Sequence, residues 1–237
     1  SYVIGDRDTD MLLAERMTIQ GIMIDPYEDD VWDKITNKIL SVDRQAKVLR
    51  KSNETEILTR VNLSASSPIS INTGIGFFDH MLEQLAKHSG ISIEIDCKGD
   101  LHIDEHHTVE DVGILLGQAL SESLGERAGI TRYADVRIPM MDSCASVCLD
   151  SVGRGNLVFK ARFPDSQVGG FDTSLVQEFF WSLSNHARID LHIELNYGLN
   201  THHMIECIFK GFARALRRAF SIDRNSDGVP STKGSMF

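Results

Sequence analysis

The sequence predicts an α+β fold made of two similar halves, each a small sheet with two helices. Short segments with strand-like alternation of apolar residues are interleaved with segments of helical spacing. This order of strands, helix, strands and helix occurs twice, over about residues 46–125 and 126–222. A His-His-x-x-Glu pattern also opens the last helix of each half, at 106–110 and 202–206. Order and motif together predict a domain with two internal repeats over residues 46–222.

The first half is expected to hold strands at 55–63, 69–71, 91–95 and 101–103. Its first helix is predicted over 76–88, because Phe77, Met81 and Leu85 have helical spacing and Gly90 is a typical residue beyond a helix C-terminus. Its second helix, with Val109, Val112 and Leu116 on one apolar face, is expected to end at Gly125.

The second half is expected to repeat this order. Its strands are predicted at 131–138, 145–149, 157–163 and 188–195. A helix opened by Asp172 precedes the last of these strands, and a long helix over 201–220 follows it. Ile205, Phe209, Phe212 and Leu216 form the apolar face of that long helix, as in its counterpart in the first half.

Residues 1–45 are expected to be a fragment of another domain followed by a linker. They have the pattern of a short buried strand, an acidic turn, an amphipathic helix and a second strand. A polar segment with one weak helix around 31–40 then leads to the main domain. At the other end, residues 223–237 are polar and rich in Gly and Ser, so a flexible tail is expected there.

Composition and charge argue against several classes of partner. The chain has 34 acidic and 24 basic side chains, a formal net charge of −10 and no long basic run, which argues against nucleic-acid binding. No apolar stretch approaches the ~20 residues that span a bilayer, and the first residues lack the layout of a secretory signal. The four cysteines form no Cys-x-x-Cys pair and are expected to be reduced and mostly buried. An intracellular, cytoplasmic protein is therefore predicted.

The repeated histidine doublets predict two metal sites. Adjacent residues on a helix diverge by about 100°, so one ion cannot easily bind both members of a doublet. The economical arrangement is two sites, each with one histidine from each doublet and a glutamate. The candidate ligands from the two halves are His106, His107, Glu110, His202, His203 and Glu206. His80, on the preceding helix, is the leading additional ligand in the first half.

A helix N-terminus carries partial positive charge, so cation sites there need additional carboxylates. The first doublet has Asp104, Glu105 and Asp111 nearby, whereas the second has only Glu206 and must draw on another segment. Imidazole and carboxylate ligands suit Mn, Fe, Zn or Ni, and ligand type alone does not choose among these metals. The remaining histidines are interpreted as structural or surface residues: His88, His102, His186 and His192.

Candidate anion-binding side chains are scattered along the chain: Arg132, Arg154, Lys210, Ser231 and Lys233. Taken singly, each is most simply a solvated polar or charged group. Lys210 lies seven residues beyond His203 and therefore about 10 Å further along roughly the same side of the helix. That separation suits a small phosphorylated substrate that spans a metal ion and a cation.

Five segments together resemble one enzyme family. They are FFDHMLEQLAKH, GDLHIDEHHTVEDVGILLGQAL, GITRY, HHMIECIFKGFARALR and PSTKG. These segments are similar to imidazoleglycerol-phosphate dehydratase of histidine biosynthesis, and the match covers residues 48–234. The resemblance implies a ribosomal protein S5 domain 2-like fold and two manganese ions per active site. It further implies a homo-oligomer, a cage of 24 subunits, with active sites at the subunit interfaces.

The opening GDRDTD resembles the late acidic motif of haloacid-dehalogenase-type phosphatases. This dehydratase is fused to such a phosphatase in some bacteria. The resemblance therefore implies that residues 1–45 are the C-terminal remnant of a phosphatase domain plus a linker. We expect no phosphatase activity from them.

Carried over to this sequence, the family's metal ligands fall on His80 and on the six doublet residues named above. The resemblance also implies that substrate phosphate lies near the five candidate anion-binding residues, with Gln84 in the same pocket. Glu54 is the implied acid/base group, and His106 and Glu206 are the other implied catalytic residues.

Two positions depart from the family pattern. The family usually has histidine where this sequence has Glu178, which would be the second-half counterpart of His80. A carboxylate can still bind manganese there, and it would supply the negative charge lacking at the second doublet. Met141 stands where the family tends to place Asp. The sequence leaves open whether the neighbouring Asp142 substitutes for that Asp.

The implied function is metal-dependent dehydration of imidazoleglycerol phosphate to imidazole acetol phosphate. The reaction removes a poorly acidic C–H proton, so metal ions on the imidazole nitrogens would stabilise the developing charge while Glu54 moves the proton. One alternative is a di-metal hydrolase that acts on phosphoesters through a bridging hydroxide. A third hypothesis is non-catalytic, with the histidine clusters joining subunits.

Overall fold

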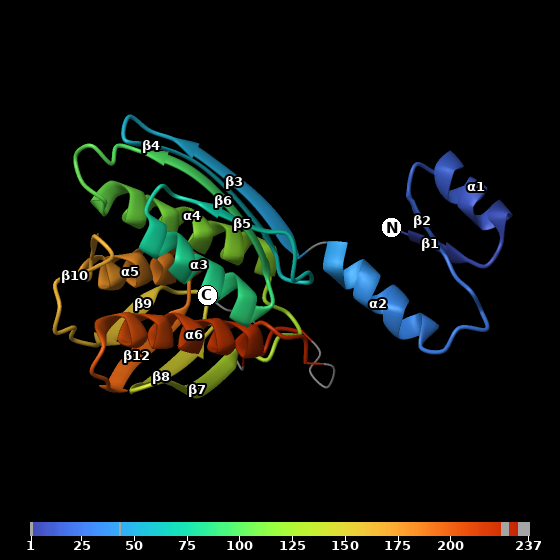
Figure 1. Ribbon diagram of the computed structural model, residues 1–237. Coiled ribbons are helices and arrows are strands. Elements are labelled where there is room, and N and C mark those ends of the chain that lie inside the picture. Colours follow the sequence, from blue (N-terminus) through green and yellow to red (C-terminus); the bar gives the residue numbers. More distant parts are fainter. Residues whose placement is uncertain (1, 43, 224–227, 232–237) are drawn as a thin grey trace. The chain divides into compact units, whose positions relative to one another are not determined.

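The computed structural model describes residues 2–42, 44–223 and 228–231 (Figure 1). The chain divides into two compact units, residues 1–43 and 44–237. Most of the polar C-terminal tail, for which the composition predicts flexibility, lies outside the described residues. In the described part of the chain, no helix is both long and apolar enough to cross a membrane.

The first unit is a strand–helix–strand segment followed by one more helix. Its elements are β1 (Tyr2–Gly5), α1 (Asp8–Arg16), β2 (Gln20–Met23) and α2 (Val31–Val42). The two strands pair in parallel, with α1 as the connection between them. Several apolar side chains of this unit, among them Leu12, Leu13 and Met17, are exposed. The observed order of strand, helix, strand and helix confirms the order predicted from the spacing of apolar residues.

The second unit begins with a sheet of four strands in the order β3-β4-β6-β5. Their bounds are β3 (Gln45–Lys51), β4 (Thr55–Asn62), β5 (Ile69–Asn72) and β6 (Ser92–Gly99). β4 pairs antiparallel with β3 and β6, whereas β5 runs parallel to β6. Alternate side chains of β4 are buried, so one face of this sheet packs on the core.

The other large sheet has the order β7-β8-β12-β9. Its strands are β7 (Tyr133–Met140), β8 (Ser143–Asp150), β9 (Asn156–Lys160) and β12 (Asp190–Tyr197). β8 pairs antiparallel with β7 and β12, and β9 runs parallel to β12. A two-residue hairpin pair, β10 (Gln167–Val168) and β11 (Phe171–Asp172), lies outside it. The two large sheets therefore share one pattern of strand directions.

Four helices fill the layer between the two sheets (Figure 1). They are α3 (Gly76–Ser89), α4 (His106–Leu124), α5 (Leu175–Ala187) and α6 (Thr201–Ala219). α4 packs on β3 and β4, and α6 packs on β7 and β8. Each of these two helices also packs along a helix from the other part of the chain, α4 along α5 and α6 along α3. Because α4 pairs with α5 and α6 pairs with α3, helix packing decides which candidate ligands lie close together.

Two glycines let α4 and α5 approach closely. A Cβ atom on Gly113 would lie 2.9 Å from the carbonyl oxygen of Phe179, and one on Gly117 would lie 2.6 Å from that of Leu183. A larger side chain at either position would force the two helices apart, because a close-packed interior has no spare volume. The spacing of Gly113 and Gly117 therefore directs α4 against α5.

Phenylalanine rings pack α3, α5 and α6 against one another. Phe179 and Phe180 of α5 contact Phe209 of α6, with ring centroids 5.4 and 4.9 Å apart. Phe78 of α3 meets Phe179 edge-on, with centroids 5.3 Å apart. All four rings are fully buried, and burying each contributes roughly 1.5–3 kcal/mol. This aromatic cluster gives α3 and α6, which carry candidate ligands, a rigid support.

The structure confirms most predicted elements. It adds β3 and the short strands β10 and β11, which the apolar pattern does not predict. The predicted strand at 101–103 is wrong, because these residues form a turn. The backbone N–H of Ile103 donates to the carbonyl oxygen of Asp100, which closes the turn on itself. Asp104 then accepts from the N–H of His106 at the start of α4. Local hydrogen bonds thus override the alternation of apolar residues.

The cysteines are free, as their spacing predicts, and three of the four are buried.

Candidate metal centre

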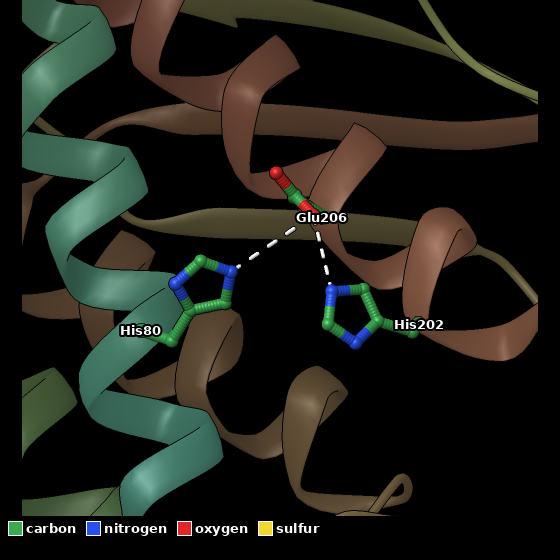
Figure 2. Close-up of side chains that lie close together, drawn as sticks. All are labelled: His80, His202 and Glu206. Carbon is green, nitrogen blue, oxygen red and sulfur yellow. Dashed lines mark hydrogen bonds and ion pairs between the residues drawn. The ribbon is translucent and has the colours of Figure 1, made fainter.

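Three candidate ligands converge between α3 and α6. The Nε2 atom of His202 lies 3.1 Å from Oε2 of Glu206, and Nε2 of His80 lies 4.0 Å from the same oxygen. Figure 2 shows the two imidazole rings pointing toward the carboxylate from opposite helices. One ligand atom from each residue lies within 4.8 Å of the other two.

Helix geometry explains how the sequence builds this cluster. His202 and Glu206 are four residues apart on α6, so they lie on the same face one turn apart. The side chain of Asn200 accepts a hydrogen bond from the N–H of His203, which places the start of α6 just before the doublet. The ring of Phe77 packs edge-on against His202, with centroids 5.3 Å apart, and orients that imidazole.

The carboxylate of the cluster is buried and charged. Only 8% of the Glu206 side chain is exposed, and Lys210 Nζ lies 2.6 Å from its second oxygen, Oε1. Burial raises the pKa of Glu206, but Lys210 and the two histidines outweigh this effect and hold the pKa below its ordinary value. Glu206 is therefore an ionised acceptor next to two imidazole nitrogens.

A divalent cation fits this donor set. Two imidazole nitrogens and one carboxylate oxygen are the mixed ligands that Mn, Fe, Zn and Ni accept. His80 and His202 are about two-fifths exposed, so an ion and further ligands have access from solvent. A cation that entered from solvent past these histidines would pair with the buried charge of Glu206.

The first doublet lies in a different environment. His107 Nδ1 bonds to Oδ2 of Asp100 at 3.0 Å, and its Nε2 lies 3.8 Å from Oε1 of Glu54, at the turn between β3 and β4. Asp100 above all raises the pKa of His107, and the charge of Glu54 acts in the same direction. His106 Nε2 lies 3.9 Å from Glu110 one turn further along α4.

His203 is held in a similar way at the second doublet. Its Nδ1 atom lies 2.5 Å from Oδ1 of Asp142, in the turn between β7 and β8. The other oxygen of Asp142 accepts from the backbone N–H groups of Leu199 and Asn200. The bond with His203, followed by these backbone bonds, holds the pKa of Asp142 well below its ordinary range. Asp142, rather than the exposed Met141, therefore faces the doublet.

Within one copy of the chain, the structure groups His80 of the first half with the second doublet. His80 lies beside His202 and Glu206. Within the part of the chain that the structure describes, the first doublet makes no hydrogen bond or ion pair with the second. The reason is the exchange of helix partners, since α3 packs along α6 and not along α4.

Within one copy of the chain, Glu178 lies nearer to the first doublet than to the second. Glu178 lies on α5, which packs along α4, the helix of the first doublet. Among the described residues of one copy of the chain, Glu178 has no bonded partner, and its role as a ligand stays a prediction. Asp142 and Glu206 supply negative charge at the second doublet.

The candidate anion-binding residues fall into separate groups. Gln84 Oε1 lies 3.1 Å from Nε2 of His88 on α3, and Lys210 is bonded to Glu206. Arg132 forms two hydrogen bonds with Asp150. A further group of Arg132 donates to the carbonyl oxygen of Pro230, next to Ser231.

The other two candidates have no contact that assigns them to a site. Arg154 is exposed and bonds to no described residue. Lys233 lies outside the described residues.

Sequence reasoning missed Asp100 and Asp142 as partners of the doublets. Both lie in turns, and neither has a fixed spacing from its histidine that a helical pattern would reveal. The available signal for Asp100 was an acidic residue between the predicted strands at 91–95 and 101–103, shortly before a doublet. His88, interpreted above as a helix-end residue, lies beside Gln84, and its pKa is lowered by burial and by the charge of Lys210.

Comparison with known proteins assigns the chain to a family. The profile described as imidazoleglycerol-phosphate dehydratase matches residues 73–216. The imidazoleglycerol-phosphate dehydratase of Oceanobacillus iheyensis is 52% identical over 193 residues, which cover 81% of this chain and 100% of that protein. The crystal structure of the Staphylococcus aureus imidazoleglycerol-phosphate dehydratase has a TM-score of 0.69 and 40% identity, covering 75% of this chain and 99% of that one.

A longer relative matches almost the whole chain. The histidine biosynthesis bifunctional protein HisB of Campylobacter jejuni is 45% identical over 234 residues, which are 99% of this chain and 64% of that protein. The chain thus spans about two-thirds of the bifunctional relative and the full length of the single-function one. The resemblance seen in the sequence is confirmed: the chain belongs to the imidazoleglycerol-phosphate dehydratase family, the hydro-lyases of histidine biosynthesis.

Proposed function

We propose that this chain dehydrates imidazoleglycerol phosphate to imidazole acetol phosphate and that divalent cations, manganese first among them, are required. Membership of the family supports the reaction. The observation that carries metal dependence is the convergence of His80, His202 and Glu206 from two helices onto one point. Packing alone does not require two histidines around a buried, ionised carboxylate, because burying a charge costs free energy.

The donor groups divide the work between them. His80, His202 and Glu206 would hold one cation, and His106 and Glu110 are donors for a second. With one histidine from each doublet per ion, His107 and His203 would complete the two sites from a neighbouring subunit. When bound, the cations act as Lewis acids that stabilise negative charge developing on the imidazole ring of the substrate. The site residues in this chain bind the ring and set its orientation.

Glu54 is the proposed acid/base group of this reaction. It lies at the exposed turn between β3 and β4, and its Oε1 atom lies 3.8 Å from His107 Nε2. A carboxylate there can accept the C–H proton and return a proton to the departing hydroxyl group. The phosphate group would be held by cationic side chains, of which Lys210 is nearest to the cluster and Arg132 adjoins the segment of Ser231.

A complete active site needs more than one copy of the chain. The cluster offers three protein ligands, and the first doublet with Glu54 stands elsewhere in the same chain. We therefore propose sites shared between neighbouring subunits of a homo-oligomer, as the family resemblance implies, with 24 subunits. The two sheets and their helices would then be the two similar halves of a ribosomal protein S5 domain 2-like fold.

The first unit is proposed to be the end of a phosphatase domain. The bifunctional relative matches this chain over residues beyond the dehydratase region and is longer than it. Exposed apolar side chains such as Leu12 and Leu13 fit a segment whose helix face packs on further structure in that domain.

Four free cysteines fit a reducing, cytoplasmic setting.

The test is turnover of imidazoleglycerol phosphate by the purified chain after chelation and after reloading with Mn²⁺. We expect the ketone or enol product only after reloading, and a loss of turnover in His80→Ala but not in His192→Ala, an exposed histidine of β12. Absence of turnover at full Mn²⁺ occupancy would contradict the proposal. Release of inorganic phosphate instead of the dehydrated product would identify a hydrolase.

A further inference from the structure

The second histidine of each doublet is bound in the same manner by an aspartate from outside its helix. His107 Nδ1 meets Oδ2 of Asp100 at 3.0 Å, and His203 Nδ1 meets Oδ1 of Asp142. Both rings are about one-third exposed. The first histidine of each doublet differs, because its Nε2 atom faces the glutamate four residues further along the helix.

We propose that Asp100 and Asp142 are positioning residues that hold His107 and His203 with the Nε2 atom available to a divalent cation. The inference rests on the metal dependence proposed above. It adds two residues that act on the ligands without touching the ion.

The chemistry follows from the number of protons on each partner. An ionised carboxylate only accepts hydrogen bonds, so the imidazole must donate from Nδ1. In a neutral ring this leaves the lone pair of Nε2 free, which is the form that binds a metal. Metal-binding histidines usually donate their other ring N–H to such a partner, which fixes the tautomer and the direction of the ring.

The two aspartates come from different places in the topology. Asp100 directly follows β6 and precedes α4, whereas Asp142 lies in the turn between β7 and β8. Two unrelated turns thus deliver the same group to the same ring atom. A purely structural turn residue has no reason to seek Nδ1 in both cases, whereas a need for a free Nε2 explains both.

Asp142 offers a specific test, because its two carboxylate oxygens accept hydrogen bonds from different donors. One accepts from the N–H groups of Leu199 and Asn200, at 2.6 and 2.8 Å, and the other accepts from His203. In Asp142→Asn the amide oxygen must serve the two backbone donors, so the NH₂ group faces His203. The ring must then accept at Nδ1 and carry its proton on Nε2, which blocks metal binding. Asp142→Ala instead loses the backbone bonds but leaves the ring free to choose its tautomer.

The two variants therefore separate a positioning role from a structural one. Thermal unfolding of the metal-free full chain should rank the wild type close to Asp142→Asn, with Asp142→Ala lowest. Mn²⁺ affinity, measured by titration calorimetry and by electron paramagnetic resonance of free Mn²⁺, should rank wild type first, Asp142→Ala second and Asp142→Asn last. The loss in Asp142→Asn should be about 10–100-fold, as for other residues that support metal ligands.

Asp100 is expected to behave differently on the same substitution. Its Oδ1 atom is buried and without a hydrogen-bond partner among the described residues. In Asp100→Asn the amide can therefore keep its oxygen on His107 and turn its NH₂ group to the other side. We expect a smaller loss of Mn²⁺ affinity than in Asp142→Asn, and an equal or larger loss would contradict the tautomer argument.

The matched control is Asp190→Asn. Asp190 also faces a histidine, His192 at 3.2 Å, but this pair lies at the surface of β12 away from the doublets. Mn²⁺ affinity should not change there. If Asp142→Ala lost more affinity than Asp142→Asn, or if both bound like the wild type, the positioning role would be refuted. Failure of the wild type to bind Mn²⁺ would instead contradict the metal dependence on which the inference rests.

Discussion

His80 Nε2 lies 4.0 Å from Glu206 Oε2, although the two residues belong to helices from different parts of the chain. The contact exists because α3 packs along α6, with His202 completing the cluster on the same side. Two imidazoles and a carboxylate thus meet at the partly exposed ends of a rigid helix pair. The predictions below test what this arrangement does.

Removal of His80 should weaken metal binding without weakening the fold. His80 is partly exposed and contributes little to packing, so the unfolding temperature of the metal-free His80→Ala variant should match that of the wild type. Mn²⁺ affinity should fall by at least about tenfold, because one of three clustered donors is lost. Calorimetric titration measures this, with His192→Ala as the control. Equal affinity in the two variants would show that His80 is not a ligand.

Lys210→Met should destabilise the metal-free protein. Glu206 is buried and relies on Lys210 for its nearest positive charge, so the variant should lose roughly 1–3 kcal/mol of unfolding free energy. Mn²⁺ should raise the unfolding temperature of this variant more than that of the wild type, because a cation replaces the missing charge. An identical Mn²⁺ effect in both proteins would speak against a cation at Glu206.

The same pair predicts a pH dependence. The pKa of Glu206 lies below its ordinary value of 4.5, so its ionised form contributes stability above pH 4.5. That contribution is lost as the pH falls through the lower pKa of the folded state. The difference in stability between wild type and Lys210→Met should therefore shrink in acid. Urea unfolding across this range checks it, and a difference that grew in acid would contradict the assignment.

Asp100 should stabilise the metal-free fold mainly below neutral pH. It raises the pKa of His107 above 6.5, so the contribution is full below pH 6.5 and is lost as the pH rises through the raised pKa. The stability gap between wild type and Asp100→Asn should be larger at about pH 5.5 than at about pH 8.5. In a His107→Gln background the gap should no longer vary with pH. A persistent variation there would assign it to another group.

Asp111 should prove to be a structural support for the turn of Glu54. Its buried carboxylate accepts from Arg50 of β3 and from the hydroxyl of Thr55, which directly follows Glu54. Asp111→Asn should cost roughly 1–3 kcal/mol of unfolding free energy, since it leaves a buried donor without its acceptor. It should also lower turnover through displacement of Glu54.

The control for Asp111 is Glu56→Gln. Glu56 pairs with Lys51 at the surface, and such pairs contribute about 0–1 kcal/mol. Urea unfolding should place this variant close to the wild type. If Asp111→Asn were equally close, the network of Arg50, Thr55 and Asp111 would have no structural weight.

Local pattern was sufficient for the helices and for the candidate ligands. Predicting the apolar faces of α3 and α6 required only residues that are close in sequence. The same holds for the end of α3 at Gly90 and for the two histidine doublets. Each of these features depends on spacing within one helix, where geometry is regular. The turn at 101–103 escaped this reasoning because its hydrogen bonds, from Ile103 to Asp100 and from His106 to Asp104, compete with the strand-like pattern.

The partners of each helix were beyond that reasoning. An apolar stripe shows that a helix face is buried but not which surface covers it, because that depends on shapes contributed by distant segments. Here Gly113 and Gly117 admit α5 against α4, which leaves α3 to pack along α6. His80 consequently joins the second doublet, and Asp100 and Asp142 reach the rings from turns without periodic spacing. One chain thus carries its candidate metal ligands in recognisable patterns, while packing between remote helices selects which of them meet.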